Sequence, residues 1–302
     1  MMEKYCNAIL FYHSKSGQSE IHQTIGKITP YLTQFTQTLT LHQTQAQGEI
    51  ELYCAKIAND PDNTIDLLIV LGGDGTVNEL VNGIVKNNID IPMAIIPGGT
   101  FNDFTRTLQL SPNAETTAKQ LVDTKEVAYD VLQVNDRFAL NFVGLGLMVQ
   151  NAENVDADAK SVLGRFSYIF STLKTLASPE SFSYELTIDN QRYTGDTYML
   201  IIANGLYVGG NRLPISELNP SDGICNVFVL QNASFGALKE FIQEKSRIDW
   251  EAFNEHISHY EGSSLTLTTT PTKKIDIDGE IDFTTPIELS VKPKAIRILT
   301  VV

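Results

Sequence analysis

The chain has 302 residues, of which 42% are hydrophobic and 19% charged, a balance typical of folded globular domains rather than of a disordered or fibrous chain. A formal net charge of −14 argues against a nucleic-acid partner, because binding to a phosphate backbone depends on many Lys and Arg contacts. No stretch approaches the ~18 apolar residues of a membrane span, and three scattered cysteines predict reduced thiols. We therefore expect two domains in a cytoplasmic protein without a transmembrane segment.

The first part of the chain predicts an α/β domain with a parallel sheet. Apolar runs at residues 7–12, 67–71 and 92–96 are typical of strands buried on both faces. The second run leads through a glycine loop into an amphipathic pattern at Val77, Leu80, Val81, Ile84 and Val85. The third run leads through another glycine loop into a predicted helix at residues 100–108. The chain thus builds strand, glycine loop and helix start twice.

From about residue 129 the apolar period changes from 3.6 to 2, which predicts an antiparallel β-sandwich. Residues 129–134 and 137–144 read as a hairpin around Asn135-Asp136. Further strands are expected at 182–188, 192–205, 224–230, 264–270, 273–278 and 287–291, and helices at 162–176 and 235–247. We place an α/β nucleotide-binding domain at residues 1–127 and a β-sandwich domain at 128–286, and expect a site in the cleft between them.

Two glycine loops carry the chemical signal. They read GGDGTVNE at residues 72–79 and PGGTFNDFTR at residues 97–106. A glycine loop that opens a helix offers backbone N–H groups and the positive end of the helix dipole to a phosphate. One Gly-Gly pair often marks only a tight turn, but two loops that share Thr and an Asn–acid pair make that interpretation much weaker. Asp74 puts a negative charge inside a phosphate loop, which is expected if a divalent cation accompanies the phosphate.

Taken together, the two motifs resemble the diacylglycerol kinase catalytic family, which includes bacterial soluble lipid kinases and sphingosine kinases and is related to NAD kinases. Further elements of the resemblance are Thr44 with Gly48-Glu49, VGGNRLP at 208–214, PSDG at 220–223 and Asp278-Gly279-Glu280. The resemblance extends from near residue 7 to the end of the sequence. It implies an α/β domain followed by an antiparallel sandwich, with strands near 287–302 that return to the first domain.

The resemblance also implies roles for individual residues. Asp278, followed by Glu280, would be the general base that takes the proton from a lipid hydroxyl. Asp74, Asp103 and Asp130 would form a carboxylate network that starts at Mg²⁺, and Asn219 and Asp222 would mark a second metal site. ATP would be held by Ser14, Lys15, Ser16, Gly17, Thr44, Gly72, Gly73, Asp74, Gly75, Thr76, Asn78 and Thr100.

The sequence departs from the family pattern at three places. His13-Ser14 replaces Asn-Pro in the first nucleotide turn, Met148 replaces an acid after the first hairpin, and Asn219 or Ser221 replaces an acid near PSDG. Outside the resemblance, residues 275–282 read first as a strand, a turn and a strand with solvated acids. The five histidines show no metal-ligand spacing.

The leading hypothesis is an ATP-dependent lipid kinase that converts diacylglycerol to phosphatidic acid. One alternative is a kinase of the same fold for phosphatidylglycerol, a sphingoid base or a soluble alcohol. Another is a nucleotide-binding regulator without catalysis, against which Asp278 argues. The lipid substrate implies contact with the inner face of a membrane, and the family suggests a homodimer.

Overall fold

The computed structural model describes residues 5–13, 18–147, 149, 180–213, 218–231 and 257–301. The chain divides into two compact units: unit 1 holds residues 1–131 and 293–302, and unit 2 holds residues 132–292. The helices expected at 162–176 and 235–247, and the position of Met148, lie outside the described residues.

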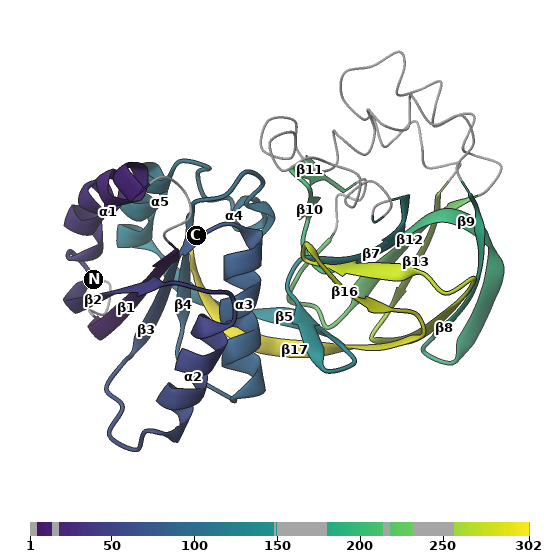
Figure 1. Cartoon of the computed structure of the whole chain (residues 1–302), viewed down its shortest axis with the longest axis horizontal. Coiled ribbons are helices and arrows are strands. Elements are labelled where there is room, and N and C mark those ends of the chain that lie inside the picture. The colour runs from purple at the N-terminus through teal and green to yellow at the C-terminus, as the bar shows by residue number, and fades with distance from the viewer. Residues whose placement is uncertain are drawn as a thin grey trace, which may run out of the picture. The chain divides into compact units, whose positions relative to one another are not determined.

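Unit 1 is an α/β unit with a parallel sheet, as predicted (Figure 1). The strand order is β17-β4-β3-β1-β2, and each adjacent pair in that order is parallel. The strands are β1 (Tyr5–His13), β2 (Thr36–Thr44), β3 (Leu67–Gly72), β4 (Met93–Pro97) and the last part of β17 (Ile287–Thr300). The helices are α1 (Gln18–Leu32), α2 (Glu49–Asn59), α3 (Asp74–Lys86), α4 (Asp103–Thr107), α5 (Ala114–Gln120) and the 3₁₀ turn η1 (Leu121–Asp123).

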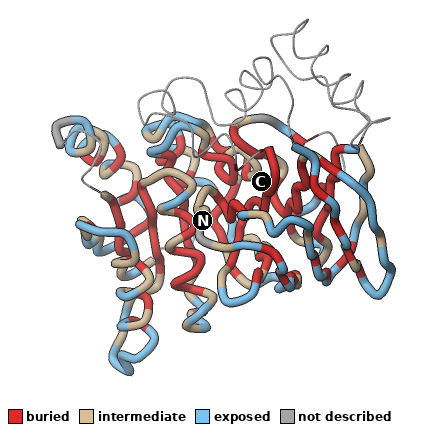
Figure 2. Tube along the Cα trace, turned by 45° about the vertical axis from the view of Figure 1, so that its right-hand side comes forward, coloured by how far each residue is buried: buried red, intermediate tan, exposed pale blue. Residues whose placement is uncertain are grey.

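Alternate residues of the central strands face two helical layers. Leu10, Ile69 and Ile96 pack with Ile28 of α1 and Leu121 of η1 in one buried cluster. On β1, the neighbouring residue Phe11 instead meets Tyr53 of α2 edge to face, with ring centroids 5.3 Å apart. Burial on both faces explains why β1, β3 and β4 are continuous apolar runs in the sequence (Figure 2).

Unit 2 is an antiparallel β-sandwich, which confirms the second half of the predicted fold class. Its main path runs β16-β15-β7-β9-β8-β14-β17, while β12 pairs with β9 and β13. The strands are β6 (Arg137–Ala139), β7 (Phe142–Gly146), β8 (Phe182–Ile188), β9 (Gln191–Ala203), β10 (Tyr207–Val208), β11 (Asn211–Arg212), β12 (Cys225–Gln231), β13 (Ile257–Gly262), β14 (Ser264–Thr270), β15 (Lys274–Ile277) and β16 (Glu280–Thr284). Alternation of buried and exposed residues along β8 and β14 fits a sheet with one face against the core.

Two strands contain residues of both units. Strand β5 (Lys125–Val134) and strand β17 each cross the boundary, and the two strands pair with each other. In unit 1, Ile298 of β17 pairs with Met93 of β4 in parallel. The sheet of unit 1 is therefore completed by a segment that lies about 200 residues later in the chain than β4.

Candidate functional site

The two glycine loops lie side by side because β3 and β4 are neighbouring parallel strands, with Gly72 opposite Pro97. The N–H of Gly98 donates to the carbonyl of Gly72 at 2.8 Å. A Cβ atom on Gly99 would come within 2.5 Å of the Cα atom of Gly73, so the main chains touch where any side chain would collide. The structure thus brings the two motifs into one loop pair.

Asp74 connects the first loop to the second. Its Oδ2 accepts the N–H of Asn102 at 2.9 Å, and its Oδ1 accepts the N–H of Asp103 at 2.7 Å. These N–H groups belong to the start of α4, where Asn102 has a left-handed backbone with φ 51°. The carboxylate therefore lies at the positive end of a short helix, which stabilises its charge. The sequence suggested a cation as the reason for an acid in this loop, and the structure adds a second reason within the protein itself.

Helix α4 is shorter than expected. The sequence predicted a helix over residues 100–108, whereas α4 spans only Asp103–Thr107. Asn102 accounts for the late start, because its Oδ1 accepts the N–H of Gly99 at 3.0 Å and its Nδ2 donates to the carbonyl of the same residue at 2.8 Å. This local ring of hydrogen bonds keeps residues 99–102 as a loop, and Thr100 lies within it.

The other predicted nucleotide residues of unit 1 fall into two groups. Thr44 ends β2, is 3% exposed, and places its Oγ1 3.1 Å from Nδ1 of His13 and 3.3 Å from the carbonyl of Tyr12. Asn78 lies in α3, is 4% exposed, and its Oδ1 accepts from Nδ2 of Asn82 at 2.9 Å. Gly72, Gly73, Asp74, Gly75 and Thr76 form the loop and first turn of α3, while Ser14, Lys15, Ser16 and Gly17 lie outside the described residues.

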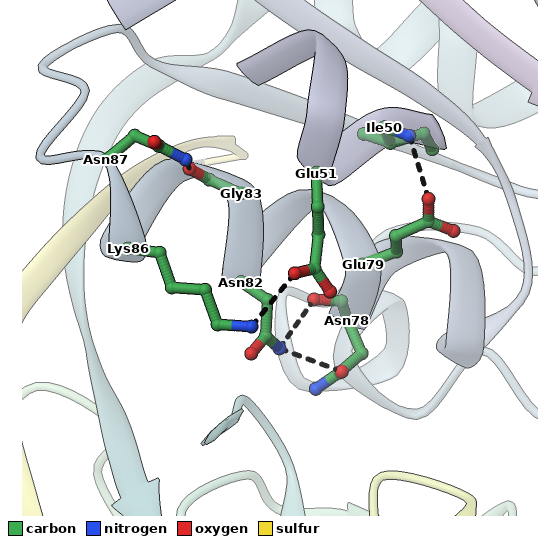
Figure 3. A network of polar contacts seen from close by, with 8 residues as sticks. All are labelled: Ile50, Glu51, Asn78, Glu79, Asn82, Gly83, Lys86 and Asn87. Carbon is green, nitrogen blue, oxygen red and sulfur yellow. Dashed lines mark hydrogen bonds and ion pairs between the residues drawn. The ribbon is translucent and has the colours of Figure 1, made fainter. Parts of the chain in front are cut away.

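Sequence reasoning did not assign a role to Glu79, the last residue of the first motif. Its Oε1 accepts the N–H of Ile50 at 2.8 Å, at the start of α2 (Figure 3). Burial raises the pKa of this carboxyl, while main-chain N–H groups of Ile50, Gly48 and Glu51 act in the opposite direction. The sequence carried one sign of this role, because Glu79 is an acid directly after Asn78 within an otherwise apolar helical pattern.

Asp130 is fully buried on β5, next to Val131, the last residue of that strand that belongs to unit 1. Its Oδ1 accepts the N–H of Lys294 at 2.7 Å, and Lys294 has a left-handed backbone with φ 52°. Asp130 and Lys294 both belong to unit 1. The carboxylate thus stabilises the left-handed backbone of Lys294 within β17.

Asp278 lies in unit 2 at the turn of the hairpin formed by β15 and β16. Asp278 and Gly279 both have positive φ, 48° and 104°, as a two-residue hairpin turn of type I′ requires. Glu280 begins β16 opposite Ile277. The interpretation of this stretch as strand, turn and strand is confirmed, but Asp278 is not a solvated acid, because only 3% of it is exposed.

Three consecutive N–H groups surround the Asp278 carboxylate. Leu140 donates to Oδ2 at 2.5 Å, while Asn141 and Phe142 donate to Oδ1 at 2.9 and 2.8 Å. The sequence predicted one strand over residues 137–144, but the structure breaks it into β6 and β7 at Leu140-Asn141. The break turns these N–H groups toward the carboxylate, which stabilises its negative charge and fixes its direction.

The residues predicted for a structural metal make local hydrogen bonds. Oδ1 of Asn219 accepts the N–H of Ser221 at 3.1 Å, and Oδ1 of Asp222 accepts the N–H of Ile224 at 2.9 Å. Within the described ranges, no three His, Cys, Asp or Glu side chains lie together as a metal cage. Mg²⁺ commonly binds through one or two carboxylates together with substrate phosphates, so Asp74 suits a phosphate-borne Mg²⁺ better than a cage formed by the protein alone.

A polar cavity of about 380 Å³ lies on unit 2. Its walls include Gln133, Asn135, Asp189, Thr266 and Glu288. Asp189 accepts hydrogen bonds from the N–H and hydroxyl groups of Ser263 and Ser264, and these bonds lower its pKa. None of these lining residues is among the predicted nucleotide, catalytic or metal residues.

Comparison with known proteins identifies related chains along the whole length. The model of the diacylglycerol kinase catalytic domain matches residues 7–134, and that of the YegS C-terminal NAD kinase beta sandwich-like domain matches residues 141–300. A protein named "Putative lipid kinase" from Staphylococcus aureus (strain MRSA252) is 45% identical over 302 residues, which is 100% of this chain and 99% of that protein. Another from Staphylococcus epidermidis (strain ATCC 12228) is 46% identical over 301 residues, covering 99% of this chain and 98% of its own length.

Solved structures agree with these matches. The crystal structure titled as a "putative diacylglycerol kinase" from Bacillus anthracis str. Sterne superposes with a TM-score of 0.87 at 32% identity. The superposition covers 99% of this chain and 96% of that one.

Proposed function

We propose, because this chain belongs to the diacylglycerol kinase catalytic family, that it transfers the γ-phosphate of ATP to the hydroxyl of diacylglycerol and yields phosphatidic acid. Its family and the names of its relatives directly support the coarser statement that it is a lipid kinase. ATP as donor and diacylglycerol as acceptor are our finer proposals.

The paired glycine loops carry the proposal. Their main chains approach so closely that a Cβ atom on Gly99 would lie 2.5 Å from the Cα atom of Gly73, and two helices begin there. Backbone N–H groups at the start of α3 suit the phosphate oxygens of a nucleotide, whereas those of Asn102 and Asp103 at the start of α4 donate to Asp74. We assign the nucleotide to this loop pair together with Thr44, Asn78, Thr100 and residues 14–17.

Asp278 is our choice for the general base. The carboxylate would accept the proton of the lipid hydroxyl while the hydroxyl oxygen bonds to the γ-phosphorus and the bond from phosphorus to the ADP oxygen breaks. Its three N–H partners hold it in one direction before substrate arrives, so little reorganisation is needed during transfer. Bound Mg²⁺ would neutralise charge on the phosphate oxygens, and Asp74, with Asp103 and Asp130 behind it, is the carboxylate that we expect to orient it.

A transfer assay tests the proposal. ATP labelled in the γ-phosphate is incubated with the protein and mixed micelles of diacylglycerol, phosphatidylglycerol or a sphingoid base, and with soluble alcohols. We expect label in phosphatidic acid, and none when the label is in the α-phosphate. Transfer to another alcohol alone would replace diacylglycerol as the acceptor. Binding of ATP without transfer to any alcohol would contradict the kinase proposal in favour of a nucleotide-binding regulator.

The lipid acceptor implies work at a membrane surface, which we propose is the inner face. No helix in the described part of the chain is long and apolar enough to cross a bilayer. With a net charge of −14, contact with an anionic surface would require a local basic or apolar patch. A homodimer remains a prediction, which light scattering of the purified protein tests.

A further inference from the structure

Helix α2 begins without a cap of its own. Its first residue is Glu49, and the preceding Gly48 has φ 89° and contributes no side chain. The first N–H groups of any helix lack partners within the helix. The Glu49 carboxylate does not fill this role, because it accepts the N–H of Gln45 at 2.8 Å.

Glu79 of α3 supplies the cap from another helix. Oε1 of Glu79 accepts the N–H of Ile50 at 2.8 Å, and the N–H groups of Gly48 and Glu51 also stabilise the carboxylate. Figure 3 shows the Glu79 side chain reaching from α3 toward the main chain of Ile50. A carboxylate at a helix N-terminus is also favoured by the helix dipole.

The two helices pack closely beside this bond. A Cβ atom on Gly83 of α3 would lie 2.7 Å from Sγ of Cys54 in α2. One turn later, Nζ of Lys86 forms an ion pair with Oε2 of Glu51 at 2.9 Å (Figure 3). The start of α2 therefore cannot move along α3 without losing the Glu79 bond or this packing.

Both acids of the first motif accept main-chain N–H groups at the start of another helix. Asp74 accepts N–H groups at the start of α4, and Glu79 accepts an N–H group at the start of α2. Helix α3 thereby fixes the second glycine loop with one acid and the segment between β2 and α2 with the other. That segment, residues 45–48, directly follows Thr44.

We propose that Glu79 is a positioning residue of the nucleotide site, which holds residues 45–48 and through them Thr44 in place against α3. The inference rests on the proposed function, because it needs Thr44 to contact the nucleotide. Glu79 acts through main-chain N–H groups and does not touch the substrate.

Two variants and a matched control test the inference. Glu79→Ala removes the cap, and we expect the KM for ATP to rise about five- to tenfold with kcat little changed, since a helix cap contributes on the order of 1 kcal/mol. Glu79→Gln keeps a carbonyl oxygen for the Ile50 N–H, so it should restore the KM to near wild type. Glu51→Ala is the control, because it breaks an ion pair of the same helix pair and leaves the cap intact.

Amide hydrogen exchange and calorimetric ATP binding complete the test. We expect residues 48–51 to exchange faster in Glu79→Ala and Glu79→Asp, whose side chain is too short to reach, but not in Glu79→Gln or Glu51→Ala. Faster exchange with unchanged ATP affinity would overturn the inference, as would an equal rise in the KM of both substrates. If Glu79→Ala does not fold, Glu79→Asp carries the same comparison. A wild-type chain that binds no ATP would instead refute the proposed function, while the exchange result would still report on the cap.

Discussion

Replacing Asp278 with Asn should change both the turnover and the local stability of unit 2. An amide has one acceptor oxygen, so it can keep the N–H groups of Asn141 and Phe142 but turns its NH₂ toward the N–H of Leu140. The loss of one hydrogen bond to a charged group, with a buried donor left facing a donor, costs about 3 kcal/mol. The usual argument that this change removes only the base therefore does not hold for this protein.

Hydrogen exchange of a peptide covering residues 137–146 measures this effect. About 3 kcal/mol corresponds to roughly 100-fold faster exchange of the amides at 140–142, if opening of this segment controls their exchange. Asp196→Asn is the matched control, because its Oδ1 accepts the exposed hydroxyl of Ser183 at 2.6 Å, and an amide oxygen can replace it. Wild-type exchange rates at 140–142 in Asp278→Asn would refute the assignment of these bonds.

The effect of Asp278→Asn on catalysis can be measured separately from its effect on stability. If Asp278 is the base, turnover should fall by about 10²–10⁴, while ATP affinity should stay unchanged because the nucleotide loops belong to unit 1. Calorimetry with ATP and the labelled transfer assay measure the two quantities. Loss of ATP affinity together with turnover would mean that the substitution also disturbs the nucleotide loops, and would contradict the assignment of Asp278 as the base alone.

Three further predictions follow from packing and burial. Gly99→Ala should separate the glycine loops and abolish ATP binding in calorimetry, whereas Gly26→Ala, which meets nothing within 4 Å inside α1, should raise the melting temperature instead. At pH 8 a thiol reagent should modify exposed Cys6 rapidly and Cys54 only after unfolding, because burial raises the pKa of the Cys54 thiol to about 12; equal rates would contradict this burial. Burial raises the pKa of Glu79, so the folded state binds its proton more tightly than the unfolded state does. The contribution of Glu79 to stability should therefore fall as pH rises from about 4.5 through the raised pKa, so the difference in urea-unfolding free energy between the wild type and Glu79→Gln should change by that amount over the same pH range.

The parts of the fold that follow from local patterns were predictable. Buried strands read as continuous apolar runs, and the exposed-buried alternation of β8 and β14 reads as period two, so both halves of the fold class follow from the residues. The glycine loops and Asp278-Gly279 carry turn chemistry that the structure retains. Neighbouring residues determine these features, which makes them visible in the sequence.

The parts that depend on distant residues were not predictable. The break at Leu140-Asn141 exists because a carboxylate more than 130 residues later accepts its N–H groups. The apolar pattern alone favours an uninterrupted strand there. Likewise, the cap of α2 comes from Glu79 on another helix, so no local pattern near Gly48 reveals it. The residue roles carried over from the family remain proposals that the experiments above address.

Strand β17 has a consequence for how the protein folds as it is synthesised. Until residues 293–302 leave the ribosome, β4 is an exposed edge of the sheet that carries both glycine loops, because Ile298 pairs with its outer side. At about 5–20 residues per second, synthesis of the intervening chain takes about 10–40 s. Unit 2 needs the same strand, because Ile287–Ser290 of β17 pair with β14, so neither sheet is complete until β17 has been made. The first unit to be translated therefore waits through the whole synthesis of the second, and a chaperone that shields a strand edge would help it most during that delay.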